Sequence, residues 1–564
     1  MFIPSLISHA SPQQQAKWIP LAQNLNIIGT YAQTELGHGT FVRGLQTTAT
    51  YDEDSQEFIV HTPTQTATKW WPGGLGKTAT HVILMARLFI KGVDHGPHAF
   101  IVQIRSLETH RSLPGITVGD IGPKFGYNGV DNGFLRFDHV RIPREDMLMR
   151  FAKVTPQGEY IKPPPSNTKA SYATMMYVRS TLVEDAGRVM QKATTIAVRY
   201  CAVRRQSAVQ AGMRETQLID YQNVGSTLIP LVATTYALHF TGIRMMKMYW
   251  EFEKSRDKGD FRVLPELHAL SSGLKAICTW EAVEGIERCR FCCGGHGYSR
   301  LSGLPDLYAS YVQNPTWEGD NDVLCLQTGR FLLKSLAGLP GKRIEGSAHY
   351  LQSFAERTAQ EQCMVKDGRD WLSHQACMHA FQFRTAFLCR MAEQTVRSEA
   401  GGKLVFDGEP WNNSTMAVIK CAAAHSWCTV LQYFLDVLEE LHASAKLPPS
   451  TLAVLNQCLL LFALTKIERH ASELLESAFL APEQLKLLRV QKDGLIRELR
   501  PNAVALVDSF GYSDYELNSA LGRADGDVYK GLLEMAQASP LNRTEEGPGW
   551  KTVLEPRMRP RAKM

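Results

Sequence analysis

The sequence lacks a long hydrophobic run. No apolar stretch approaches the ~20 residues that cross a bilayer, so we expect no membrane span. The opening MFIPSLISHA has neither the basic region nor the long apolar core of a signal peptide, and it is not rich in Arg like a transit peptide.

The sequence also lacks a large excess of charge of one sign. The 61 Lys and Arg against 56 Asp and Glu give a net charge of +5 over 564 residues, which argues against nucleic acid as a partner.

A disulfide framework is absent too. The 12 cysteines are scattered and include the adjacent pair Cys292-Cys293, so a reducing compartment is indicated. Cys289, Cys292, Cys293 and His296 have an approximate zinc spacing, but no second pair of ligands occurs elsewhere. Packing of these cysteines at a helix end is the favoured interpretation, and we predict no metal.

The common nucleotide-binding motifs are missing. Gly76-Lys77-Thr78 resembles the end of a P-loop, but Trp71 occupies the position where that motif needs a glycine. No G-x-G-x-x-G follows a strand, so a Rossmann dinucleotide site is not supported.

The pattern of the chain predicts an α+β multidomain protein that is mostly α. Short apolar or alternating runs at 41–45, 57–61, 81–87, 98–104 and 134–142 are separated by turn residues, which is typical of a small β-barrel or sandwich and not of a doubly wound parallel sheet. Helical periodicity follows the prolines at 163–165. We predict a helical remnant at 1–28, a β domain at 29–160, helical-bundle domains at 167–340 and 345–545, and a tail at 546–564.

Three segments suggest chemistry. Glu318 lies in Pro315-Thr-Trp-Glu-Gly-Asp-Asn321, where an aromatic neighbour would desolvate the acid and sharpen it as a base; a helix-capping carboxylate is the alternative. Lys69-Trp-Trp-Pro-Gly-Gly-Leu-Gly76 offers indoles and open backbone amides to a flat heteroaromatic ring, unless the tryptophans simply pack in a core. Arg199, Arg204, Arg205 and Gln206 could hold a pyrophosphate or form a solvated helix face.

Together these motifs resemble the peroxisomal acyl-CoA oxidases. The resemblance runs in unbroken order from residue 1 to about 545 and rests on YAQTELGHGT (31–40), KWWPGGLGKT (69–78), PGITVGDIGPKFG (114–126), Arg204-Arg-Gln206, CGGHGY (293–298), WEGDN (317–321), RPNAVALV (500–507) and SPLN (539–542).

The resemblance implies FAD, bound between β and helical domains, and oxidation of fatty acyl-CoA to trans-2-enoyl-CoA with O2 reduced to H2O2. It implies that Glu318 is the base that removes the α-proton and that Thr34 and Gly73 contact the flavin. Arg204 and Gln206 match residues that reach the FAD of a neighbouring subunit, which implies a homodimer. Asn321 is implied to line the cofactor.

Two departures from the family leave alternatives open. About a hundred residues that precede the point matching Met1 in full-length members have no counterpart here, so the chain looks like an N-terminally shortened oxidase. Trp317 stands where a smaller aromatic residue is typical. The bulk of Trp317 would alter which acyl chain lengths fit. Because of the missing residues, a catalytically weak or inactive paralogue that dimerises as a partner or regulator is one alternative, and an acyl-CoA dehydrogenase is a lesser one.

The chain ends in Ala562-Lys563-Met564, which has the small-basic-apolar pattern of a peroxisomal address. With the resemblance, this ending predicts recognition by the import receptor and a location in the peroxisomal matrix.

Overall fold

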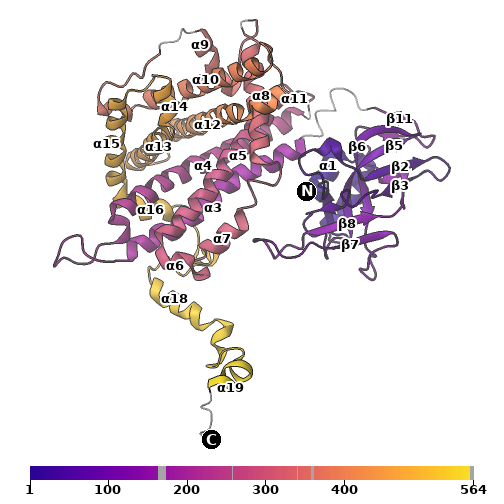
Figure 1. The fold of residues 1–564 in the computed structure, drawn as a ribbon, viewed down its shortest axis with the longest axis horizontal. Coiled ribbons are helices and arrows are strands. Elements are labelled where there is room, and N and C mark those ends of the chain that lie inside the picture. Colours follow the sequence, from indigo (N-terminus) through magenta and orange to yellow (C-terminus); the bar gives the residue numbers. More distant parts are fainter. Residues whose placement is uncertain (163–172, 257, 340, 357–360, 559–564) are drawn as a thin grey trace. The chain divides into compact units, whose positions relative to one another are not determined.

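The computed structural model describes residues 1–162, 173–256, 258–339, 341–356 and 361–558 (Figure 1). Contacts divide the chain into two compact units. The β unit comprises Met1–Arg179 with the short segment Thr316–Asp320, and the helical unit comprises Ser180–Pro315 with Asn321–Met564.

The β unit is built on a mixed six-stranded sheet and a three-stranded antiparallel sheet. In the larger sheet the order is β1-β5-β2-β3-β9, and β6 pairs with β5; the smaller one has the order β4-β8-β7. The strands are β1 (Gly29–Ala32), β2 (Thr48–Asp52), β3 (Glu57–His61), β4 (Lys69–Trp70), β5 (His81–Ile90), β6 (Val93–Gln103), β7 (Ile116–Asp120), β8 (Gly133–Phe137), β9 (Val140–Pro143), β10 (Lys153–Val154) and β11 (Tyr160–Ile161).

Strand alternation gives the large sheet two apolar faces. In β5, Val82 and Leu84 point into the core of the β unit, whereas Ile83 points to the opposite face. Helices α1 (Phe2–His9) and α2 (Pro12–Gln23) cover that opposite face and contribute Leu6 and Trp18 to its core. The predicted helical segment at the N-terminus therefore packs on the sheet.

The predicted strands are confirmed with two corrections. The run at 41–45 is not a strand, because Gly44 and Leu45 donate backbone hydrogen bonds to Phe41 and Val42 and close a 3-10 turn (Val42–Gly44). The alternating run at 134–142 is two strands, since His139 adopts a left-handed φ of 51° and breaks the extended chain.

The helical unit is a bundle of long helices with α12 at its centre. α12 (Thr415–Ser444) packs against α4, α5, α8, α10 and α13, so helices from both predicted helical domains share one compact unit (Figure 1). The boundary predicted near 340–345 stays a prediction. The other helices are α3 (Ala173–Val203), α4 (Gln222–Arg256), α5 (Leu264–Cys292), α6 (Gly294–Tyr298), α7 (Leu304–Tyr311), α8 (Asn321–Ala337), α9 (Tyr350–Glu356), α10 (His374–Glu399), α11 (Gly408–Asn413), α13 (Pro449–Arg469), α14 (Ala471–Glu476), α15 (Pro482–Leu499), α16 (Ala503–Asp508), α17 (Asp514–Leu517), α18 (Val528–Gln537) and α19 (Glu555–Met558).

Within the described ranges, α13 alone is long and apolar enough to cross a membrane by length and composition, with a mean hydropathy of 1.5. It is also a core helix: residues 459–464 are almost fully buried, as their apolar run predicts.

Candidate functional site

The candidate base, Glu318, lies in a strained loop. Its φ is 54° and that of Gly319 is 107°, both in the left-handed region that a residue with a Cβ rarely adopts. Such conformations cost about 1–3 kcal/mol and persist where surrounding contacts fix them, often at functional sites. The backbone N–H of Asn321 donates to the carbonyl of Pro315 over 3.0 Å and closes the loop at its base.

Two polar side chains of the β unit, the buried Arg179 and the partly buried Tyr31, interact with the Glu318 segment. The Nε of Arg179, on α3, donates to the backbone carbonyl of Glu318 over 3.2 Å, and this arginine is only 8% exposed. Burial lowers the pKa of Arg179, and the Glu318 charge opposes that shift. Burial raises the pKa of Tyr31, and the Glu318 charge raises it further. The carboxylate therefore lies in an environment that is partly dry and includes the positive charge of Arg179.

The aromatic neighbour of Glu318 packs against the β unit. The ring of Trp317 meets that of Tyr127 edge to face, with centroids 5.8 Å apart, and Trp317 remains 38% exposed. Glu318 itself is half-buried. The predicted partial desolvation of this acid by its neighbours is consistent with these contacts.

The Trp-Trp-Pro-Gly-Gly turn and Thr34 lie together in the β unit. The N–H of Trp70 donates to the carbonyl of Thr34 over 3.0 Å, and the hydroxyl of Thr30 donates to the carbonyl of Gly73 over 2.7 Å. Trp71 has a φ of 86° and is 53% exposed, so its indole does not pack in the core, whereas Trp70 stacks on Phe134. Thus Thr34 and Gly73, the two residues predicted to contact the flavin, are held in one connected segment.

A buried ion pair fixes this segment. Lys69 and Glu35 are 3.0 Å apart (Nζ–Oε1), and neither side chain is exposed. The ammonium also donates to the carbonyl of Gln33 over 3.0 Å, and Glu35 accepts from the backbone of Gln46 and Thr47. Burial lowers the pKa of Lys69 to about 8 although Glu35 opposes that shift, and the ammonium lowers the pKa of Glu35. Since Thr34 lies between two of these anchors, its backbone is held from both sides.

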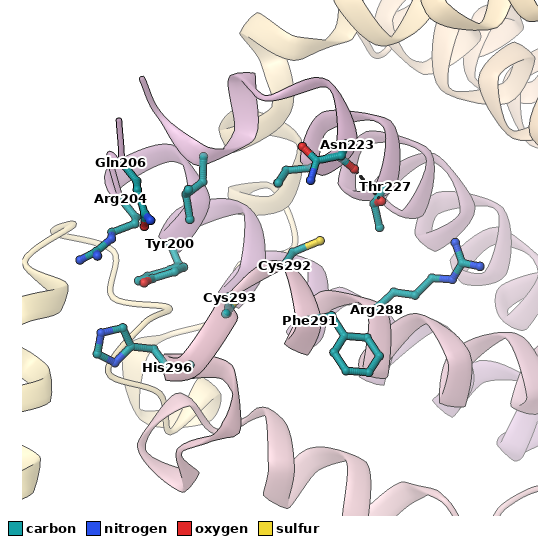
Figure 2. A pocket seen from close by; sticks show the side chains of 14 residues that line it. Tyr200, Arg204, Gln206, Asn223, Thr227, Arg288, Phe291, Cys292, Cys293 and His296 are labelled. Carbon is teal, nitrogen blue, oxygen red and sulfur yellow. Dashed lines mark hydrogen bonds between the residues drawn. The ribbon is translucent and has the colours of Figure 1, made fainter. Parts of the chain in front are cut away.

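The helical unit contains a pocket of about 880 Å³ at the ends of α3 and α5 and the start of α4 (Figure 2). Arg204 and Gln206 line it, but Arg205 does not. Residues 204–206 pair with residues 216–218 through an isolated antiparallel bridge between Arg205 and Gln217. Because side chains alternate along such an extended segment, the side chain of Arg205 points to the side opposite those of Arg204 and Gln206. The guanidinium of Arg205 bonds instead to the carbonyl of Glu215.

The glycine-rich turn at 293–298 forms the opposite wall of this pocket. Gly294 has a φ of 58°, and no atom lies within 4 Å of the position of a Cβ on Gly294 or Gly295, so the turn is open to a ligand. At Gly297 the absence of a side chain allows close packing instead, because a Cβ there would lie 2.1 Å from the carbonyl oxygen of Arg290. With Arg204 and Arg288, the pocket offers two guanidinium groups beside unobstructed backbone, which suits a phosphate-containing ligand.

The cysteines of this turn are packed at a helix end, as predicted. Cys289 and Cys293 are buried, and burial raises the pKa of the Cys292 thiol to about 12, which disfavours the thiolate that zinc binds. In the described residues these cysteines and His296 do not form a metal-ligand group. Arg199, the other member of the predicted basic group, pairs with Asp508 over 2.8 Å (Nε–Oδ1) and does not line the pocket.

Asn321 is buried in the helical unit, 1% exposed. Its carbonyl oxygen accepts from Nζ of Lys275 over 2.9 Å, and its Nδ2 donates to the carbonyl of Ala276 and the hydroxyl of Thr279, each over 3.0 Å. These bonds occupy the amide with α5. The structure thus gives Asn321 a positioning function, and its contact with a cofactor stays a prediction.

The family models described as "Acyl-CoA oxidase, C-alpha1 domain" and "Acyl-CoA oxidase" match residues 172–333 and 373–559. Two more, "Acyl-CoA dehydrogenase, middle domain" and "Acyl-coenzyme A oxidase N-terminal", match 30–140 and 1–28. Peroxisomal acyl-coenzyme A oxidase 1 of Rattus norvegicus is 44% identical over 99% of this chain and 83% of its own length, and the Arabidopsis thaliana protein of that name has the same identity and coverage.

Solved structures agree. Arabidopsis thaliana acyl-CoA oxidase 1 has a TM-score of 0.93, 44% identity and coverage of 99% of this chain and 83% of its own. Acyl-CoA oxidase-1 of Caenorhabditis elegans, complexed with FAD and ATP, has a TM-score of 0.91, 39% identity and coverage of 99% and 82%. This chain belongs to the peroxisomal acyl-CoA oxidase family. The resemblance, the fold class and the enzyme class predicted from the sequence are therefore confirmed.

Membership identifies the chain as an oxidoreductase that acts on acyl-CoA with a flavin cofactor, and it places the chain among peroxisomal proteins. For this oxidase, sequence reasoning missed two neighbours of the candidate base. Tyr31 belongs to the motif YAQTELGHGT (31–40), but the sequence assigns it no function. Arg179 lies within a helical pattern 139 positions from Glu318, and nothing in the sequence around it indicates a contact with the base.

Proposed function

We propose that this oxidase converts fatty acyl-CoA to trans-2-enoyl-CoA in the peroxisomal matrix, with Glu318 as the base and FAD as the flavin. The observation that carries the proposal is the strained loop in which Arg179 holds the backbone of Glu318. A base on a closed loop keeps its carboxylate in one position, which proton transfer requires.

The α-hydrogen beside a thioester is only weakly acidic, so the chain must do two things: present an ionised carboxylate and keep water away from it. Arg179 favours the ionised form through its positive charge. Tyr31 and Trp317 exclude part of the water around the segment. Glu318 then takes the α-proton on its carboxylate oxygen.

The residues present fit FAD in both units. In the β unit, Thr34 and Gly73 would hold the isoalloxazine ring, and the exposed indole of Trp71 offers a flat apolar surface beside Gly73. In the helical unit, Arg204 and Gln206 would hold the pyrophosphate, with the open amides of Gly294 and Gly295. When bound, FAD would supply the acceptor for the β-hydrogen and the route by which its electrons reach O2 to give H2O2.

We further propose a homodimer in which Arg204 and Gln206 of one subunit serve the FAD of the other.

The proposed import signal, Ala562-Lys563-Met564, lies outside the described residues. Its function is tested by deleting these three residues: we expect loss of matrix import in cells, and import that continued without them would remove them from that function.

The test of the activity is direct. The purified full chain should be yellow and release H2O2 when it is mixed with a straight-chain fatty acyl-CoA in air. A colourless protein that releases no peroxide would contradict the proposal and support a partner or regulator. A yellow protein that reduces an electron-transfer flavoprotein without oxygen, and reacts little with O2, would indicate a dehydrogenase.

A further inference from the structure

Three side chains with metal-binding groups meet where the β unit changes from one sheet to the other. His61 ends β3 of the six-stranded sheet, and Asp138 and His139 form the turn from β8 of the small sheet to β9 of the large one. One ligand atom from each lies within 4.8 Å of the other two. No other group of His, Cys, Asp or Glu in the described ranges converges in this way.

The geometry of the three groups is close to that of a ligand set. Nδ1 of His139 is 2.8 Å from Oδ1 of Asp138, and Nδ1 of His61 is 3.9 Å from the same oxygen. The two imidazole rings are stacked, with centroids 3.9 Å apart and an interplanar angle of 22°. Both rings therefore lie on one side of the turn, beside the carboxylate.

Backbone pairing holds the three positions. Thr62, next to His61, donates its N–H to the carbonyl of Phe137 and accepts the N–H of Phe137 on its hydroxyl, both over 2.9 Å. Val60 faces Val140 in the register of β3 and β9, so the turn is fixed on both flanks. Asp138 donates its N–H to the carbonyl of Gly115 over 2.8 Å. The backbone that carries the ligands therefore needs little reorganisation to bind an ion, and the side chains of Asp138 and His139 are 83% and 67% exposed.

One ring nitrogen of this group has no protein partner. Nδ1 of His61 is shielded from solvent and forms no hydrogen bond with the described residues, although the side chain as a whole is 30% exposed. A shielded polar atom without a partner costs free energy. A cation beside Asp138 and His139 would satisfy it.

We propose, in place of the expectation of no metal drawn from the sequence, that His61, Asp138 and His139 bind a divalent first-row transition cation, principally Zn²⁺. Two imidazoles and one carboxylate are ligands that Zn²⁺ prefers, whereas Ca²⁺ and Mg²⁺ prefer oxygen alone. Three protein ligands leave a position for water. The bound ion links the end of β3 to the β8–β9 turn and stabilises the β unit by mass action.

This site is separate from the proposed base and from the residues proposed to hold FAD, so its test does not depend on turnover. Full-length protein is freed of metal with a chelator and titrated with Zn²⁺ in a calorimeter. The variants are His61→Ala and His139→Asn. His110→Asn is the matched control, because His110 is also exposed, lies in the β unit and has a left-handed φ of 57°. Asparagine tolerates that conformation.

We expect one Zn²⁺ per chain whose affinity falls in each of the two variants by at least about 10-fold, the lower end of the loss seen when even an orienting partner of a ligand is removed. His110→Asn should bind like the wild type. Crystals soaked in Zn²⁺ give an independent readout that does not depend on the folding of any variant: an anomalous peak should lie between His61, Asp138 and His139. Wild-type affinity in both variants, or no peak at this position, would overturn the proposal.

Discussion

The guanidinium of Arg179 and the backbone carbonyl of Glu318 are joined by a hydrogen bond of 3.2 Å (Nε–O) between positions 139 residues apart. Both positions belong to the β unit, so the bond holds the segment Thr316–Asp320 within that unit. It restrains a backbone that is otherwise strained, and it brings a buried positive charge near the proposed base. Arg179 is thus a positioning residue for Glu318.

Replacement of Arg179 by Gln should lower kcat/KM by about 10–100-fold, which corresponds to the 1.5–3 kcal/mol of a hydrogen bond to a charged group. Flavin content should stay unchanged. Loss of the positive charge favours the protonated carboxylic acid, so the acidic limb of the pH–rate profile should move to higher pH. A lower rate with an unmoved profile would mean that Arg179 is merely structural. Arg179→Lys keeps the positive charge, so its pH–rate profile should lie closer to that of the wild type.

Arg204 and Arg205 are a matched pair for the pocket in the helical unit, because only Arg204 lines it. Arg204→Ala should weaken FAD binding by about 10–100-fold through loss of a charge-assisted contact. Arg205→Ala should leave FAD binding within about 5-fold, since an exposed contact contributes about 1 kcal/mol or less. Flavin released on dilution, measured by fluorescence, compares the two variants.

The same residue tests the dimer. If Arg204 serves the neighbouring subunit, mixed dimers of Arg204→Ala and Glu318→Gln chains contain one complete site and should regain activity that neither variant has alone under limiting FAD. No recovery in the mixed dimers would show that Arg204 acts within its own subunit.

Asn321→Ala separates a positioning function from direct contact with the cofactor. The substitution removes the hydrogen bonds of the amide to α5, including one to the buried ammonium of Lys275, and should lower the free energy of unfolding by at least about 2 kcal/mol. We expect the loss in protein without flavin as well as with it. A stability loss confined to the flavin-bound protein would instead support direct contact with FAD.

His425, on α12, gives a pH dependence of stability. Burial lowers the pKa of His425 from 6.5 to about 4; its Nδ1 lies 3.0 Å from the hydroxyl of Tyr350 and its Nε2 has no partner among the described residues. The unfolded chain therefore takes up this proton first as the pH falls. The free energy of unfolding is therefore at its full value above pH 6.5, and it falls by roughly 3 kcal/mol as the pH is lowered to 4.

His425→Leu should remove that part of the pH dependence, measured as the difference in unfolding free energy between pH 7 and pH 4 in urea. His442→Ala, which changes an exposed histidine on the same helix, is the control and should keep the wild-type dependence. An unchanged difference in His425→Leu would show that this histidine does not bind its proton on unfolding.

The helices and most strands could be predicted because periodicity and turn residues act over short distances, as in β3 and α13. The break at His139 could not, because an alternating run does not reveal one left-handed residue. Motifs brought Glu318, Arg204 and Gln206 to attention. The local pattern could not show that Arg205 points away from the pocket, because this depends on its bridge to Gln217. It also could not show that Arg179 contacts the backbone of Glu318, because that contact joins distant segments.

The same limit applies to Asn321 and to the cysteines near the pocket. A polar residue next to a proposed base looks like a ligand in the sequence, and only packing shows that its amide is bonded to Lys275 and Thr279. In the sequence, the spacing of these cysteines is the same whether they bind zinc or pack at a helix end. In the described residues the structure does not bring these cysteines and His296 together as a metal-ligand group.

Glu318→Gln shows whether Glu318 removes the α-proton. Gln has nearly the same shape but cannot accept the proton, so the variant should fold and bind flavin like the wild type. Exchange of the substrate's α-hydrogen with deuterated solvent, and H2O2 release, should each fall by at least about 100-fold, the lower end of general base catalysis. Wild-type rates of exchange and peroxide release in a yellow, folded Glu318→Gln protein would contradict the account.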